Sequence, residues 1–237
     1  QKRLSWYYQQ VLKISFVIDF VKRKKENMII WDADTILINK ITFFKNNYSN
    51  YHGTTSYFHK AYYITNLNIL GELPKYFISS LSQFISITPL EIDFLIKKLS
   101  KKKRKIRKTG EWLTHIIMQS IASVHLQYNG SLFSEYELIG QSNLLLNFKK
   151  QNLVSGIRDH LNGKLTSLQI LFLKYLGFKY IAYEHTHPNV NSRNMLFRNQ
   201  TWGVFLRILL NKLSNNFFRG IKHNLNYIIN VLKPTVR

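Results

Sequence analysis

The stretch NMIIWDADTILINK, residues 27–40, constrains this chain more than any other. It places Asp32 and Asp34 one residue apart, directly after an apolar run. The chain has 12 acidic residues against 34 Lys and Arg, so a close pair of aspartates stands out. Neighbouring carboxylates repel each other unless a cation lies between them, and hard divalent cations prefer oxygen ligands. The pattern therefore indicates a metal-binding loop at the carboxyl end of a short buried strand.

Two chemical interpretations of this pair compete with a structural one, in which the aspartates only shape a turn. In a phosphatase, Asp32 would be the nucleophile and Asp34 the acid, and further acids would complete the metal site. The later aspartates are Asp93, inside a predicted helix, and Asp159, which argues against this interpretation. In a glycosyltransferase, the pair would hold Mg²⁺ or Mn²⁺, which neutralises the leaving diphosphate of a nucleotide-sugar as a Lewis acid.

Alternating helical and strand patterns predict an α/β fold. The helix with the clearest signals begins after Thr88, which is followed by Pro89 and by Glu91 at the capping-box position. A polar, aromatic segment at 46–60 is typical of a loop. Helices are expected at 4–20, 87–102, 111–126, 134–148 and 165–178, and strands at 28–31, 36–44, 75–80 and 179–187.

Charge divides the chain into two expected parts. The 237 residues suit one domain with a small appendage, and we assign them to a domain at 1–190 and a basic amphipathic helical tail at 191–237. The net charge of +22 favours an anionic partner, although an AT-rich genome would also produce this composition. A basic amphipathic tail is suited to an anionic membrane surface; the alternative is an ordinary helix that packs on its own domain.

Several classes of protein are excluded. The chain has no cysteine, which rules out a disulfide framework and a thiolate metal site. No apolar run is long enough to span a bilayer, and no secretory signal is visible at the start. Nucleic acid is not expected as a partner, because zinc-finger spacing and aromatic RNA-binding signatures are absent from the sequence.

Five segments taken in order resemble a family of bacterial glycosyltransferases of the GT-A type, which act in surface-polysaccharide biosynthesis. They are WYYQQVLKISF, MIIWDADTILI, KYFISSLSQF, GEWLTHIIMQ and SEYELIG, and they cover about residues 5–140. The resemblance implies a Rossmann-like mixed sheet flanked by helices, here with a C-terminal helical extension. The family's first strand and helix, which bind the nucleotide base, have no counterpart before Trp6, so the chain is expected to be N-terminally truncated. The basic tail does not match the family.

The resemblance also implies roles for individual residues. Asp34 is the expected direct metal ligand, and Asp32 is expected to bind the donor ribose or a metal-bound water. His185 is a candidate third metal ligand, because several GT-A enzymes use a late histidine and imidazole suits Mn²⁺.

Gln10 and Lys13 share one face of the first predicted helix by their spacing. In the family this helix faces the donor, so Lys13 is expected to pair with the diphosphate and Gln10 to bind sugar or nucleotide; the alternative is a solvated surface pair. Glu135 is the candidate general base that deprotonates the acceptor hydroxyl, with Glu111 as its rival. Glu137 stands at a capping-box position after Ser134.

The sequence thus predicts a metal-dependent, hexosyltransferase-like enzyme. It would move a sugar from a nucleotide-sugar to a bacterial surface glycan such as lipopolysaccharide or capsule. The expected cofactor is Mn²⁺ or Mg²⁺, and the expected location is cytoplasmic, peripheral on the inner face of the cytoplasmic membrane. Two alternatives stay open: a non-catalytic basic protein that binds membrane surfaces or nucleic acid, and a truncated, inactive glycosyltransferase.

Overall fold

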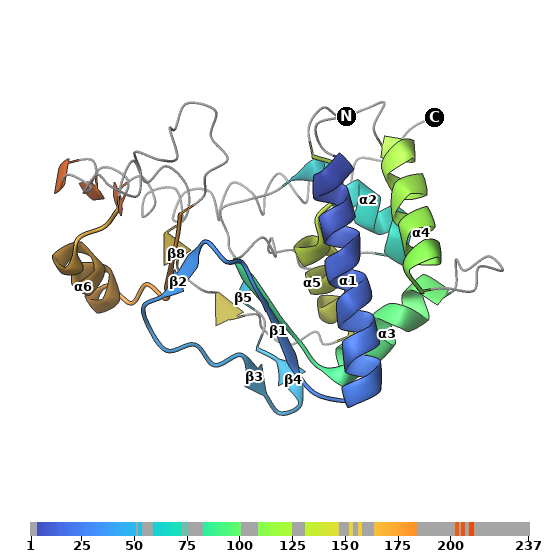
Figure 1. Ribbon diagram of the computed structural model, residues 1–237, viewed down its shortest axis with the longest axis horizontal. Helices are drawn as coiled ribbons and strands as arrows, with labels where there is room; N and C mark the ends of the chain where they lie inside the picture. The colour runs from blue at the N-terminus through green and yellow to red at the C-terminus, as the bar shows by residue number, and fades with distance from the viewer. Residues whose placement is uncertain are drawn as a thin grey trace. The chain divides into compact units, whose positions relative to one another are not determined.

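The computed structural model describes most of the chain up to residue 183 and three short pieces beyond it. The described residues are 4–50, 52–53, 59–72, 74, 83–100, 109–124, 131–146, 152–153, 156–157, 164–183, 202–203, 205–206 and 209–210. The chain divides into two compact units, the first drawn from 1–31, 42–53 and 59–152 and the second from 32–41, 54–58 and 153–237. Six helices and small mixed sheets make up the described part, so the expected α/β class is confirmed (Figure 1).

The first unit is mainly helical. Its helices are α1 (Leu4–Lys24), α2 (Lys60–Leu70), α3 (Pro89–Ser100), α4 (Thr109–Val124) and α5 (Glu135–Leu146). Its strands are β1 (Met28–Trp31), β3 (Phe44–Lys45), β4 (Tyr48–Ser49), β5 (His52–Gly53) and β6 (Phe84–Ile87), and β7 (Asn152–Leu153) lies at its end. Strand β1 pairs antiparallel with β6, from Met28 opposite Ile87 to Trp31 opposite Phe84.

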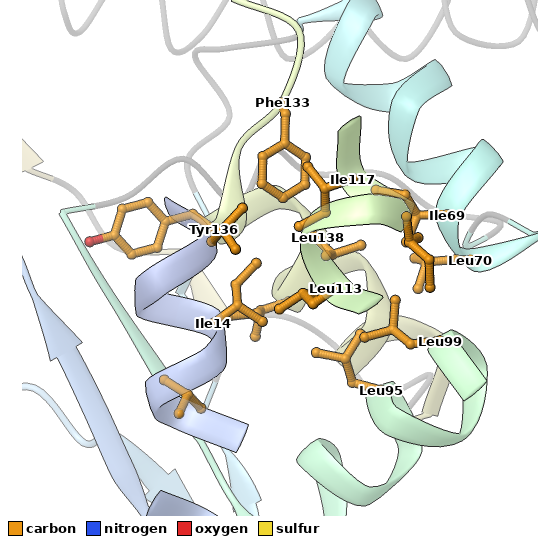
Figure 2. Packing of buried hydrophobic residues seen from close by; sticks show 14 of the residues in the cluster. Ile14, Ile69, Leu70, Leu95, Leu99, Leu113, Ile117, Phe133, Tyr136 and Leu138 are labelled. Atoms are coloured by element: carbon orange, nitrogen blue, oxygen red, sulfur yellow. The ribbon is translucent and has the colours of Figure 1, made fainter. Parts of the chain in front are cut away.

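Helix α5 lies at the centre of this unit. All nine residues from Glu135 to Asn143 are buried, and the helix contacts α1, α2, α3 and β6. Figure 2 shows apolar side chains converging around it, among them Ile14 of α1 and Leu113 of α4. A helix buried on every side must satisfy its polar side chains internally, and this requirement shapes the candidate site.

The second unit contains a three-stranded mixed sheet. Its elements are β2 (Thr35–Leu37), β8 (Gly156–Ile157), α6 (Ser167–Tyr175) and β9 (Tyr180–Ala182). Strand β9 is central, antiparallel to β2 and parallel to β8. Gly156 lies against the buried ring of Tyr180, where a Cβ atom would overlap the ring. The separate core of this unit comprises Ile157, Leu165, Leu173, Phe178, Ile181, Phe205 and Leu209.

Several expected elements differ from the observed ones. Strand β1 is half-buried rather than buried, with Ile29 exposed. The expected loop at 46–60 contains β4, which forms a hairpin with β3 around Asn46 and Asn47. Both asparagines have positive φ angles, 52° and 62°, as a tight hairpin turn requires. Helix α2 and strand β6 were not expected. The strand expected at 75–80 lies outside the described residues, as does most of the 191–237 tail.

No helix among the described residues is long and apolar enough to cross a membrane.

Candidate functional site

Asp32 and Asp34 lie in the turn that connects β1 to β2, as the sequence predicts. The Thr35 N–H donates to the Asp32 carbonyl (3.1 Å) and closes the turn, and the Tyr183 N–H donates to the Asp34 carbonyl (2.9 Å). The Thr35 hydroxyl donates to Oδ1 of Asp34 (3.2 Å). Both aspartates are half-buried. The backbone of the turn is therefore fixed by hydrogen bonds, and neither aspartate is fully buried.

Two half-buried aspartates on a fixed turn fit a hard divalent cation only if other oxygens complete its coordination. Among the described residues, no group of three or more His, Cys, Asp or Glu side chains is arranged to hold a metal ion. Mg²⁺ is commonly bound by one or two carboxylates together with substrate phosphates and water, so the pair suits a cation that arrives with a phosphate ligand. The predicted ligand His185 lies outside the described residues.

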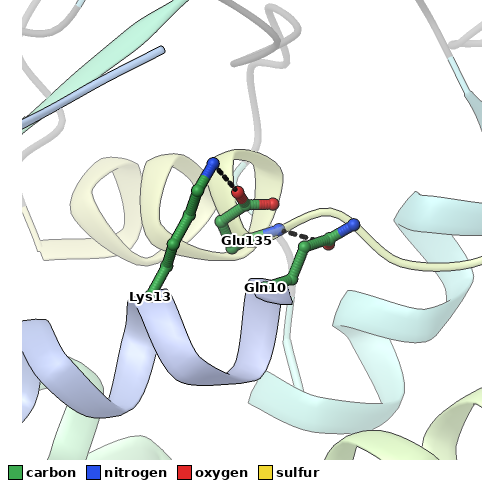
Figure 3. Close-up of polar contacts among 3 residues, drawn as sticks. All are labelled: Gln10, Lys13 and Glu135. Atoms are coloured by element: carbon green, nitrogen blue, oxygen red, sulfur yellow. Dashed lines mark hydrogen bonds and ion pairs between the residues drawn. The ribbon is translucent and has the colours of Figure 1, made fainter. Parts of the chain in front are cut away.

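A second group of predicted residues meets in the first unit, where α1 passes the start of α5 (Figure 3). The Lys13 ammonium forms an ion pair with Oε1 of Glu135 at 2.9 Å. The Glu135 backbone N–H donates to the amide oxygen of Gln10 at 3.1 Å. These contacts join residues more than 120 positions apart in the sequence. The prediction that Gln10 and Lys13 share a face of α1 is consistent with both residues contacting Glu135.

Burial changes the interpretation of these residues. Gln10 is 2% exposed and Glu135 is 3% exposed, so Gln10 is not part of a solvated surface pair. The Lys13 side chain is 25% exposed, and its ammonium also lies 5.0 Å from the centre of the Tyr136 ring. Lys13 therefore has a protein partner in Glu135, whereas the family resemblance implies a donor diphosphate as its partner.

One polar atom of Gln10 makes no hydrogen bond. This atom, the amide nitrogen Nε2, is buried, and Figure 3 shows that it points away from Glu135. An unpaired buried donor costs free energy. Tyr7 is also a residue of α1, and its hydroxyl oxygen accepts a hydrogen bond from the Leu132 N–H (3.0 Å). The loop that leads into α5 is thus held by two side chains of α1.

Glu111, the rival of Glu135, lies exposed in the first turn of α4. Glu137 is buried, and its Oε2 accepts a hydrogen bond from the Gln141 amide at 3.4 Å.

Sequence reasoning missed a second role for Glu91. The capping box with Thr88 is present: the Thr88 N–H donates to Oε2 of Glu91 (2.8 Å), and the Glu91 N–H donates to the Thr88 hydroxyl (3.4 Å). Oε1 of Glu91 also accepts from the backbone N–H of Ser49 (3.0 Å) and from its hydroxyl (2.5 Å). The Asn143 amide donates to the same hydroxyl oxygen (3.2 Å).

Burial raises the pKa of Glu91 above its ordinary 4.5, against the lowering effect of these hydrogen bonds. The capping pattern identifies the Thr88 contact, but nothing in the sequence indicates Ser49.

Comparison with family models, with curated proteins and with solved structures finds no match to this chain.

Proposed function

We propose that this protein is a metal-dependent glycosyltransferase of the GT-A type that takes its sugar from a nucleotide diphosphate donor. The observation that carries the proposal is the Asp-Ala-Asp turn after β1, with its backbone fixed by Thr35 and Tyr183 and its two aspartates half-buried. The resemblance of residues 5–140 to bacterial GT-A sugar transferases is the second support.

The chemistry of the turn suits a diphosphate ligand. Asp34 and Asp32 would hold Mn²⁺ or Mg²⁺, and the phosphate oxygens of the donor would occupy further coordination positions. When bound, the cation would stabilise the negative charge that develops on the leaving diphosphate. Thr35 would keep the Asp34 carboxylate oriented through its hydrogen bond to Oδ1. The acceptor would be a surface glycan, in line with the resemblance.

Glu135 as the general base stays part of the proposal, with one condition set by its contacts. Because Oε1 is paired with Lys13 and the side chain is 4% exposed, an acceptor hydroxyl would have to approach a carboxylate that is already ion-paired. Lys13 is thus better assigned to holding Glu135 in position than to binding a phosphate.

Asp34→Asn tests the metal role of the turn. The Asn side chain keeps an oxygen that accepts from Thr35 but loses the charge that binds a cation. We expect uridine diphosphate to bind in the presence of Mn²⁺, and the variant to weaken this binding about tenfold or more. Isothermal titration calorimetry, with and without Mn²⁺, is the measurement; other nucleoside diphosphates follow if the uridine form does not bind.

Asp19→Asn is the matched control, because Asp19 is an exposed aspartate of α1 and the substitution changes the net charge equally. If Asp34→Asn and the wild type bind uridine diphosphate with equal affinity, the turn has no role in binding the donor. Folded protein that binds no nucleoside diphosphate with either metal would contradict the transferase proposal and leave the non-catalytic alternative.

A further inference from the structure

Helix α6 is apolar on two opposite faces. One face packs into the core of the second unit through Leu173, which is fully buried. The opposite face carries Leu168 (67% exposed), Leu171 (61%) and Tyr175 (86%), which lie at helical spacing. Exposed apolar side chains that gather on one surface commonly mark an interaction site, so the exposed face of α6 is suited to a partner.

The described part of the C-terminal segment adds to this surface. Phe205 (0% exposed) and Leu209 (4%) pack into the same core. Leu206 (42% exposed) and Leu210 (65%), each one position further along, are exposed to solvent. Trp202 (45% exposed) contacts the ring of Phe172 on α6, with 6.4 Å between ring centres. We define the apolar face of the second unit as Leu168, Leu171, Phe172, Tyr175 and Trp202.

The charge of this part of the sequence indicates the chemistry of a partner. Residues 164–237 contain eleven Lys and Arg and one acidic residue, Glu184, a difference of +10. Lys164 and Lys174, at the start and the end of the α6 region, are exposed. A second copy of the chain would bring the same positive charge to the contact, which is repulsive. Nucleic acid would match the charge but would gain little from exposed leucines.

We propose that the apolar face of the second unit docks on the surface of an anionic phospholipid membrane. Leucine side chains and the amphipathic rings of Tyr175 and Trp202 enter the boundary between headgroups and acyl chains, where such residues bind favourably. Lys164 and Lys174, which flank the face, contact the lipid phosphates. This inference is independent of the proposed transferase activity, because it rests on burial and charge in the second unit alone.

Leu171→Glu tests the proposal, with Leu12→Glu as the matched control. Leu12 is an exposed leucine (48%) on α1 of the first unit, so both substitutions place one carboxylate at an exposed helical leucine and change the net charge equally. Co-sedimentation is measured with vesicles of phosphatidylcholine alone and of phosphatidylcholine mixed equally with phosphatidylglycerol. We expect the wild type and Leu12→Glu to bind the anionic vesicles, and Leu171→Glu to bind about tenfold more weakly or not at all.

Circular dichroism verifies that both variants fold, and light scattering after size exclusion gives their oligomeric state. Equal binding of Leu171→Glu and wild type would overturn the proposal, as would equal losses in both variants, since net charge alone would then explain binding. A wild type that does not bind anionic vesicles overturns it as well. Dissociation of a dimer by Leu171→Glu, without an effect on vesicle binding, would assign the face to a second copy instead.

Discussion

Glu135 brings a carboxylate into the interior of the first unit, at the start of a helix that is buried on every side. A buried charge is tolerated only when partners replace its hydration. Lys13 supplies the opposite charge at 2.9 Å. The amide oxygen of Gln10 accepts a hydrogen bond from the backbone N–H of Glu135. At the residue scale, these contacts fix the first turn of α5 against α1 and give Glu135 its orientation.

Lys13→Met should destabilise the protein, because it leaves the Glu135 carboxylate buried without its cation. Removing one partner of a fully buried pair costs about 3–5 kcal/mol; Lys13 is 25% exposed, so we expect a loss of about 1–3 kcal/mol. The double variant with Glu135→Gln should lose less than the sum of the single variants, because neither charge is then left alone. Urea denaturation of all four proteins measures this coupling.

Lys98→Met is the matched control, because Lys98 pairs with Glu72, whose side chain is 54% exposed. Exposed ion pairs contribute about 0–1 kcal/mol, so this variant should lose less stability than Lys13→Met. Equal losses at the two positions, or strict additivity in the double variant, would contradict a stabilising role of the Lys13–Glu135 pair.

At the scale of elements, Glu91 connects three of them. Its carboxylate caps the start of α3 through Thr88 and accepts two hydrogen bonds from Ser49 of β4, whose hydroxyl oxygen also accepts from Asn143 of α5. A short strand such as β4 gains little stability from its own two residues. This buried carboxylate therefore helps to hold β4 in the unit, together with the pairing of β4 with β3.

Glu91 should make stability depend on pH. In the unfolded chain Glu91 ionises near 4.5, whereas in the folded protein burial raises its pKa. As pH rises from about 4.5 to the higher folded pKa, the unfolded state loses this proton first, so the contribution of Glu91 to stability falls. We expect the free energy of unfolding of wild type relative to Glu91→Gln to decrease over this window, as measured by denaturation at a series of pH values.

Two comparisons sharpen this measurement. Glu91→Gln should itself cost about 1–3 kcal/mol, because one amide oxygen cannot replace two carboxylate oxygens that accept three donors. Ser49→Ala removes the hydroxyl donor that lowers the pKa of Glu91, so it should extend the window to higher pH. If the free energies of unfolding of wild type and Glu91→Gln change in parallel with pH, Glu91 has the same pKa in the folded and the unfolded protein.

At the scale of the whole molecule, the chain forms two units with separate cores. The first core is built mainly from the helices α1 to α5, and the second from the β2–β9–β8 sheet, α6 and the segment around Phe205. The second unit is drawn from 32–41, 54–58 and 153–237, so the chain passes between the two units more than once. Phe205 and Leu209 of the carboxyl-terminal segment thus share a core with Ile38, which follows β2 early in the chain.

Phe205→Ala should destabilise the second unit by about 3–5 kcal/mol, because it removes a fully buried ring and leaves a cavity. Leu206→Ala, at the next position, should change stability by no more than about 0.5 kcal/mol, because Leu206 is 42% exposed. Differential scanning calorimetry measures both. Equal effects, or a larger effect at Leu206, would mean that the segment packs with a different face.

Local patterns along the sequence determined much of the secondary structure. Apolar spacing identified α1, α3, α4, α5 and α6, the capping box located the start of α3, and the Asp-Ala-Asp turn follows its strand as predicted. These features depend on residues that are close to one another along the chain, so the sequence alone displays them. Helix α2 escaped prediction because its aromatic and β-branched run from Tyr62 to Thr65 has weak helix propensity.

Only the tertiary structure decided which side chains are covered and which distant residues meet. Spacing placed Gln10 and Lys13 on one face of α1, but the contact of that face with Glu135 depends on a helix more than 120 residues later. Likewise, Leu206 and Leu210 share a face with helical spacing and are nevertheless exposed, while Phe205 and Leu209 are buried. Periodicity specifies which residues point in the same direction; whether that direction is toward core or solvent depends on the elements that pack there, and their approach is set by the free energy of the whole chain.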